Sequence, residues 1–137
     1  MRLWYLLPLL LLLTGCGGPY RIAPVSGQVT LNGQPLANAA VSFQPVASEG
    51  KNNPGPGSGA FTDSDGRYTL VVVGHETRGA VVGKHKVRIT LVADTDSADD
   101  RPKRVKQLPA KYNKKTTLEY DVPPGGSTAA DFPLTAP

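Results

Sequence analysis

Two aspartates near the middle of the sequence are the first candidates for binding a metal ion. Asp63 and Asp65 are followed by glycine, as at the start of a calcium-binding EF-hand loop. A loop that starts at Asp63 needs a bidentate glutamate at its twelfth position, and that position is Gly74. A different calcium site would have to recruit carboxylates from residues 94–100. We predict instead that both aspartates accept hydrogen bonds from backbone amides in a tight turn, and that no metal is bound.

A serine and two histidines are the remaining candidates for catalysis. Ser58 follows Pro56-Gly57, whereas the nucleophile elbow of hydrolases has the pattern Gly-x-Ser-x-Gly. His75 and His85 are the only histidines and Cys16 is the only cysteine, so these residues make at most an incomplete transition-metal site. His85 has the parity of the inward-facing residues of its strand and is expected to bond a backbone carbonyl, whereas His75 is expected in an exposed loop. We therefore predict no enzymatic activity and no cofactor.

The residues before Cys16 have the composition of a secretory signal peptide. A single positive charge, Arg2, precedes an apolar run that extends from residue 3 to residue 13. As a helix this run would span ~16 Å at ~1.5 Å per residue, about half of the ~30 Å hydrocarbon core. We therefore expect a segment that is removed after export and not a membrane span.

The sequence Leu13-Thr14-Gly15-Cys16 resembles the lipobox of bacterial lipoproteins. The resemblance implies that the Cys16 thiol receives a diacylglyceryl group, that residues 1–15 are removed and that Cys16 becomes the first residue. Two or three acyl chains, at ~0.8 kcal/mol per buried methylene, would anchor the protein almost irreversibly. The absence of an aspartate at Gly17 favours the outer membrane. The alternative is an ordinary signal peptide followed by a chance cysteine.

The charge of the remaining chain is only mildly basic. Without residues 1–15 it has 14 basic and 11 acidic side chains, far from the dense basic footprint of a nucleic-acid-binding protein. The length of 137 residues favours one domain. We expect a monomer held at a membrane by its lipid, with an envelope polysaccharide or protein as its partner and no nucleic acid.

One part of the sequence has an uneven distribution of charge. Residues 94–100 contain four aspartates, and residues 101–115 contain seven basic side chains and no acidic one. One interpretation is a solvated loop whose two halves pair loosely. The other is contact with an anionic surface, with Leu108 and Tyr112 fixing the segment to the domain. The basic residues expected to make that contact are Arg101, Lys103, Arg104, Lys106 and Lys111.

Alternating apolar residues predict strands throughout residues 25–137. The first strand covers residues 25–31 and turns at Asn32-Gly33, with residues 41–43 on the return. A second hairpin is predicted around residues 63–66, and its strand at residues 67–73 is apolar on both sides, so we expect it to be covered on both faces. Further strands are expected in three segments, which are residues 84–91, 118–122 and 130–134.

The segments between these strands complete the predicted architecture. Residues 46–58 lack an apolar pattern and contain several glycines and prolines, which indicates a mobile loop. Residues 16–24 are rich in glycine and proline and are interpreted as a lipidated tether. About seven short strands and no convincing helix predict an antiparallel β-sandwich.

Several of these motifs together resemble the carboxypeptidase regulatory-like domain. The resemblance covers residues 25–92, and Pro109-Ala-Lys-Tyr-Asn113 is similar to a segment of small bacterial lipoproteins that carry this domain. It implies a transthyretin-like or Ig-like sandwich over residues 25–137. The matching motifs are those of turns and core positions, so they specify a fold and leave function open. They are Val25-Ser-Gly-Gln-Val29, Asn32-Gly-Gln-Pro-Leu36, Val41-Ser-Phe43, Thr62-Asp-Ser-Asp-Gly-Arg-Tyr68 and Gly83-Lys-His-Lys-Val-Arg-Ile89.

The sequence as a whole thus predicts a lipid-anchored, extracytoplasmic β-sandwich protein of the cell envelope without enzymatic activity. Its expected role is that of a binding or structural module. A first alternative is an accessory module that binds carbohydrate or wall polymer through the loops at residues 46–58 and 93–116. A second alternative is an envelope hydrolase.

Overall fold

The fold consists of β-strands with one short 3-10 helix. The structure is a computed structural model that describes residues 20–48, 52–92 and 108–137, and no α-helix occurs among them. The all-β class predicted from the sequence is therefore confirmed. The elements are β1 (Ile22–Ala23), β2 (Ser26–Leu31), β3 (Gln34–Pro35), β4 (Ala39–Pro45), β5 (Ser58–Phe61), β6 (Arg67–Thr69), β7 (Val71–Val72), β8 (Ala80–Val81), β9 (Gly83–Leu91), the 3-10 helix η1 (Ala110–Tyr112), β10 (Glu119–Val122) and β11 (Phe132–Leu134).

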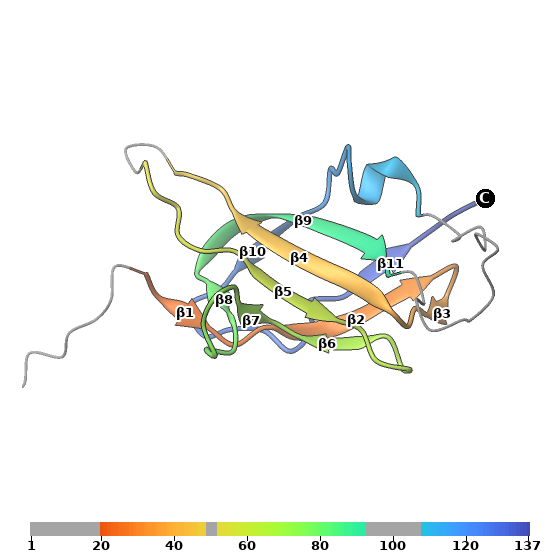
Figure 1. Cartoon of the computed structure of the whole chain (residues 1–137), viewed down its shortest axis with the longest axis horizontal. Helices are drawn as coiled ribbons and strands as arrows, with labels where there is room; N and C mark the ends of the chain where they lie inside the picture. The colour runs from red at the N-terminus through yellow and green to blue at the C-terminus, as the bar shows by residue number, and fades with distance from the viewer. Residues whose placement is uncertain (1–19, 49–51, 93–107) are drawn as a thin grey trace, which may run out of the picture.

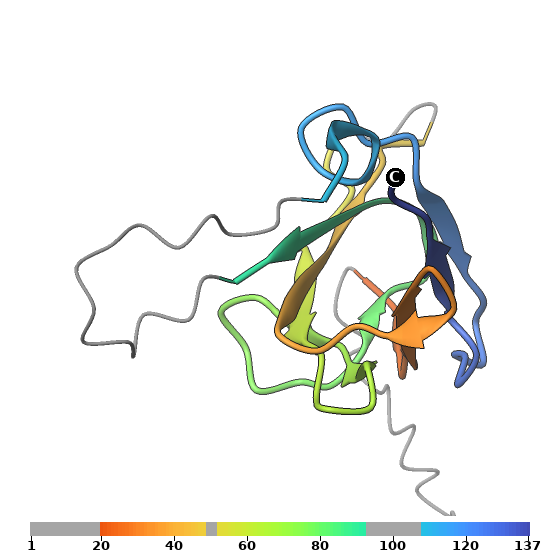
Figure 2. The same ribbon diagram turned by 90° about the vertical axis from the view of Figure 1, so that its right-hand side faces the viewer.

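The strands form two facing sheets in a β-sandwich-like arrangement (Figures 1 and 2). The larger sheet has the order β10-β9-β4-β5-β7, and the smaller has the order β11-β2-β3, with β6 also paired to β2. A ribbon of β1 and β8 lies at one end of the molecule. The pairing is antiparallel as predicted, except that β11 runs parallel to β2.

Neither predicted hairpin continues as expected. Asn32 and Gly33 do form a tight turn with positive φ angles, but the returning strand β3 ends at Pro35 and β4 lies in the other sheet. Pro35 has no N–H to donate to a ladder, which places it at an edge and favours the exit of the chain. The strands on either side of residues 63–66 do not pair with each other either. The chain crosses there from β5 in the larger sheet to β6, which pairs with β2.

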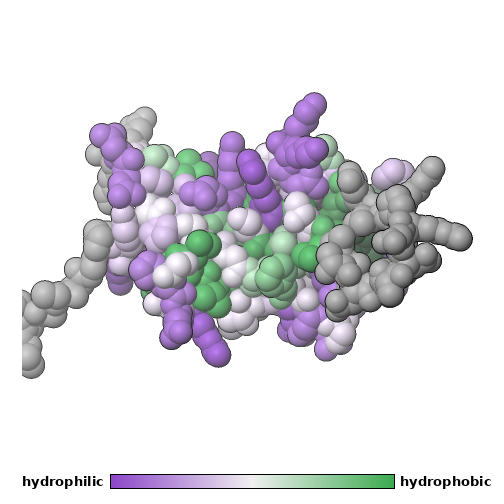
Figure 3. Space-filling view, in the orientation of Figure 1, coloured by the Kyte–Doolittle hydropathy of each residue, from purple (hydrophilic) through white to green (hydrophobic). Residues whose placement is uncertain are grey.

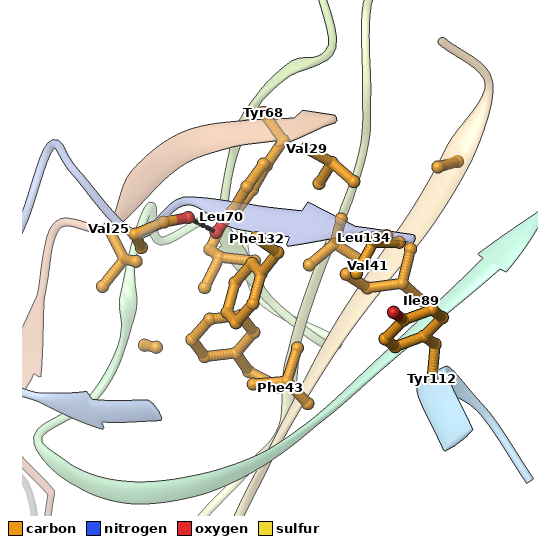
Figure 4. Close-up of a cluster of buried hydrophobic side chains, with 14 of the residues drawn as sticks. Val25, Val29, Val41, Phe43, Tyr68, Leu70, Ile89, Tyr112, Phe132 and Leu134 are labelled. Atoms are coloured by element: carbon orange, nitrogen blue, oxygen red, sulfur yellow. Dashed lines mark hydrogen bonds between the residues drawn. The ribbon is translucent and has the colours of Figure 1, made fainter. Parts of the chain in front are cut away.

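The strand pair β4–β9 is the centre of the larger sheet. Seven residues of β4 pair in register with β9, from Ala39 opposite Leu91 to Pro45 opposite His85. In β9 the predicted alternation is confirmed, because Val87 and Ile89 are buried and Arg88 is exposed. The inward rows of both sheets make one core, in which the Phe43 and Phe132 rings meet edge to face at 6.0 Å (Figure 4).

The ordered domain begins before residue 25. Ile22 and Ala23, which the sequence placed in the tether, pair with Val81 and Ala80. Ala23 is buried, and its carbonyl oxygen lies so close to Gly79 that a Cβ there would be 2.2 Å away. The strand pairing therefore extends into the predicted tether.

The strand segment around β7 is covered on only one face. Tyr68, Leu70 and Val72 are buried as expected, but Val71 is 38% and Val73 is 65% exposed. The prediction that both faces are covered is wrong. β7 is the edge strand of the larger sheet, and its outer face carries no further layer among the described residues.

Candidate functional site

Exposed apolar side chains gather on the outer face of the larger sheet. Phe61 at the end of β5 is 71% exposed, and Val71 and Val73, in and after β7, line the same surface hollow. Figure 3 shows this patch over β5 and β7, with hydrophilic side chains along its border over β9. The inner face of this sheet already forms the core, so Phe61 on the outer face is exposed to water. An exposed phenylalanine of this kind is a candidate contact with a partner.

The strand register explains why the patch is hollowed. Ala40 lies opposite Phe61, and Ser42 lies opposite Gly59, which in turn lies opposite Val71. The floor between Phe61 and Val71 is thus made of small residues with little or no side chain. The resulting open groove has a volume of about 760 Å³ and is lined mainly by apolar atoms.

Basic residues lie on β9, the strand next to the β4 side of this groove. In the β4–β9 pairing Arg88 lies opposite Ser42 and Lys86 lies opposite Gln44, and both basic side chains point outward. Among the residues that the structure describes, the only ion pair is Lys84–Glu119, at 3.2 Å, one strand further out. The face therefore changes across its strands from cationic on β9 to apolar on β7.

The outer face of the smaller sheet is polar by comparison. Its outward residues on β2 are Ser26, Gln28 and Thr30, and the Asp131 carboxylate accepts a hydrogen bond from the Gln28 amide at 2.8 Å. The Gln28 side chain donates to the Asp65 carbonyl at 2.8 Å. The apolar patch is therefore a property of one face of the domain only.

A second hollow, of about 660 Å³, lies where the chain enters the domain. Tyr20 and Arg21 form one side, the β4 end and the beginning of the predicted 46–58 loop form another, and residues 81–84 close it. It contains both apolar and polar atoms, with Val46 42% exposed at its border. This hollow places the root of the 46–58 loop beside the N-terminal strand.

Most of the residues singled out for lipidation or surface contact lie outside the described residues. They are Cys16, Arg101, Lys103, Arg104 and Lys106. Lys111 is described and lies exposed in η1, with its Nζ 5.0 Å from the centre of the Tyr112 ring. Leu108 and Tyr112 are buried as predicted, and Thr135 N–H donates to the Tyr112 hydroxyl at 3.0 Å. Figure 1 places η1 at the opposite end of the molecule from β1.

The two histidines have the positions that the sequence predicts. His85 is fully buried and donates from Nε2 to the Val81 carbonyl at 2.7 Å, which leaves Nδ1 without a protein partner. Burial lowers the pKa of His85, and the Val81 carbonyl opposes this effect only in part, so the ring is neutral near pH 7. His75 is exposed.

The remaining chemical candidates are structural. Asp63 Oδ1 accepts hydrogen bonds from the backbone amides of Asp65 and Arg67, and Gly66 has a positive φ, which confirms the predicted turn. The prediction is wrong for the Asp65 side chain, which accepts no backbone hydrogen bond among the described residues. Ser58 is 1% exposed and its Oγ has no hydrogen-bond partner among the described residues, so none of them is placed to act as its base. Within the described part of the chain no three potential ligands lie close enough to hold a metal ion.

The groove was not predicted from the sequence, although its signal is present there. Ala40 and Ser42 on β4 and Gly59 on β5 point outward. Their side chains are unusually small for a sheet face that is exposed to solvent. Which strand lies beside which depends on the sheet order, and the order is not visible in a local pattern.

No helix among the described residues has the length and hydropathy needed to cross a membrane. Comparisons with protein-family models, with curated proteins and with solved structures found no match.

Proposed function

We propose that this chain is a lipid-anchored, extracytoplasmic β-sandwich protein that serves the bacterial cell envelope as a non-enzymatic binding or structural module. The observation that carries the anchor is the sequence Leu13-Thr14-Gly15-Cys16 behind an apolar leader. The open groove beside the exposed Phe61 supports a binding role. The resemblance of residues 25–92 to carboxypeptidase regulatory-like domains supports a transthyretin-like type of sandwich.

Metabolic labelling with an alkyne fatty acid tests the anchor directly. We expect the wild-type protein to incorporate the label and the Cys16→Ser variant to incorporate none, because Cys16 is the only thiol in the sequence. The variant should also retain residues 1–15, which increases its mass. Equal labelling of both proteins would refute lipidation at Cys16.

A second candidate function is that of an accessory module that binds carbohydrate or wall polymer. The hollow beside Tyr20 and Val46 favours it, because this hollow lies at the root of the 46–58 loop. Hydrogen exchange measured with and without soluble wall polymer would test it. Protection of residues 46–58 is expected if the polymer binds there, and unchanged exchange would reject this function.

The basic residues of the 101–115 segment support a separate proposal, contact with an anionic surface. The end of β9 and the helix η1, which flank the undescribed stretch, lie at the end of the molecule away from β1 (Figure 1). Replacing Lys103, Arg104 and Lys106 by Gln should weaken binding to anionic vesicles at low salt if this segment makes the contact. Unchanged binding would leave it a solvated loop.

A further inference from the structure

We propose that the outer face of the larger sheet is the side of the domain that lies against the membrane. Phe61, Val71 and Val73 would enter the lipid interface, and Lys86 and Arg88 would lie beside anionic head groups. This inference rests on the lipid anchor proposed above. It concerns how the anchored domain is oriented, a property that the anchor alone does not determine.

The length of the tether limits how far the domain can be from the lipid. Tyr20 is the first described residue, and Cys16 precedes it by four residues, which span at most ~14 Å at ~3.6 Å each. Figure 1 shows β1, which begins just after Tyr20, at the same end of the molecule as β7 and β8. The end of the apolar patch that contains Val73 is therefore held close to the membrane surface.

The chemistry of this face matches a lipid interface. Head groups and upper acyl chains accept apolar side chains, and anionic head groups attract lysine and arginine. The larger sheet presents both on one face, because the strand pairing places Val71 and Arg88 at the two ends of one row across the sheet, with Gly59 and Ser42 between them. The groove is open and not enclosed, which suits an extended surface better than a small molecule that must be surrounded.

The two carboxylates of the larger sheet lie on the far side of the basic strand from the apolar patch. Glu119 and Asp121 lie on β10, away from the apolar patch, where they are opposite Lys86 and Lys84 of β9, and Glu119 pairs with Lys84. An approach in which the β7 edge is tilted towards the lipid keeps both carboxylates in water. The outer face of the smaller sheet is polar and includes the Asp131 carboxylate, which accepts from the Gln28 backbone N–H. Turning that face to the membrane would bring a carboxylate, and no apolar patch, to the lipid.

Site-specific fluorescence on the lipidated protein tests the orientation. The only native cysteine is acylated in this proposal, so an introduced cysteine is the only free thiol. We would attach an environment-sensitive fluorophore at Ser42→Cys in the groove and, as the matched control, at Thr30→Cys on the outer face of the smaller sheet. The protein is placed in nanodiscs that contain phosphatidylglycerol and a spin-labelled quencher lipid.

We expect the fluorophore at position 42 to be quenched and the one at position 30 to remain unquenched. Each basic residue at an anionic surface changes the binding equilibrium about fivefold, so Lys86→Gln with Arg88→Gln should lower the docking constant about 25-fold. Phe61→Ser should lower it as well. Phosphatidylcholine nanodiscs and high salt should each reduce quenching at position 42.

Three results would overturn the proposal. Equal quenching at positions 42 and 30 would mean that the larger sheet's outer face is not oriented towards lipid. Absence of quenching at both positions would mean the same, and this result is also expected if a protein covers that face. Loss of quenching in the Lys103, Arg104 and Lys106 variant, with no effect of the Lys86 and Arg88 pair, would assign docking to the other segment. Fatty-acid labelling of the same samples separates these results from failure of the anchor itself.

Discussion

Removing the buried hydroxyl groups of Thr62 and Ser58, which lie close together in the fold, should change the free energy of unfolding in opposite directions. Thr62 is 5% exposed, and its Oγ1 donates to the Leu36 carbonyl at 2.7 Å and accepts from the Ala39 amide at 2.9 Å. These bonds hold the segment that carries the chain from the first turn into β4. Ser58 is 1% exposed and its Oγ bonds to no protein atom.

The structure gives the expected size of each effect. Thr62→Val keeps the shape but removes two hydrogen bonds of ~1 kcal/mol each and leaves a buried amide and a carbonyl unpaired, at ~1–3 kcal/mol for a lost partner. We expect the free energy of unfolding to fall by about 2–4 kcal/mol. Ser58→Ala removes a hydroxyl that was buried without a bond, so we expect no loss and a gain of up to ~1 kcal/mol.

Urea unfolding followed by circular dichroism measures both changes. The only tryptophan, Trp4, lies in the predicted leader, so tryptophan fluorescence would not report on the domain. The midpoints should move in opposite directions at an unchanged m value. If Ser58→Ala destabilises the protein as much as Thr62→Val does, a bound water or another partner satisfies the Ser58 hydroxyl and the reasoning is wrong.

Three further predictions test the packing and the buried polar groups. Gly27→Ala should destabilise the protein by ~3 kcal/mol or more, because its Cβ would lie 2.0 Å from the Ala130 carbonyl oxygen, whereas Gly125→Ala, with open space, should be neutral in the same urea titration. The lowered pKa of His85 means that the unfolded state binds a proton more readily, so stability should fall as pH drops below ~6.5. This fall should be weaker in His85→Gln, and equal slopes in urea titrations across pH would contradict the assignment. Tyr68→Phe should cost about 1–2 kcal/mol in thermal unfolding, because it breaks the hydrogen bond to the Ala130 carbonyl that Figure 4 shows, and an unchanged melting temperature would argue against that bond.

The extent to which the sequence predicted this fold depends on whether a feature is local. The alternation of β9 is local, and it predicted which side chains are buried, including His85. The turns at Asn32-Gly33 and at Asp63 were also predicted from local residue types. The pairing partners were not, because β4 and β6 each leave the strand before them and join a different sheet.

The candidate groove was not predicted for the same physical reason. Val71 and Val73 alternate with buried residues and look like the second side of a central strand. Only the sheet order shows that β7 is an edge strand whose outer face has no cover among the described residues. The Gly59 and Ser42 floor beside it depends on the register between β4 and β5, which is set by tertiary packing.

The parallel pairing of β11 with β2 has a consequence for how the domain folds. Phe132 lies opposite Val29, and Gln28 N–H donates to an Asp131 side chain 103 residues away in sequence. A chain synthesised only as far as β10 lacks the Phe132 and Leu134 side chains of its core and leaves one edge of β2 without a partner. Closing so long a loop is slow, in the millisecond to second range typical of sandwiches with distant contacts. Completion of the core therefore waits until β11 has been made and has paired with β2.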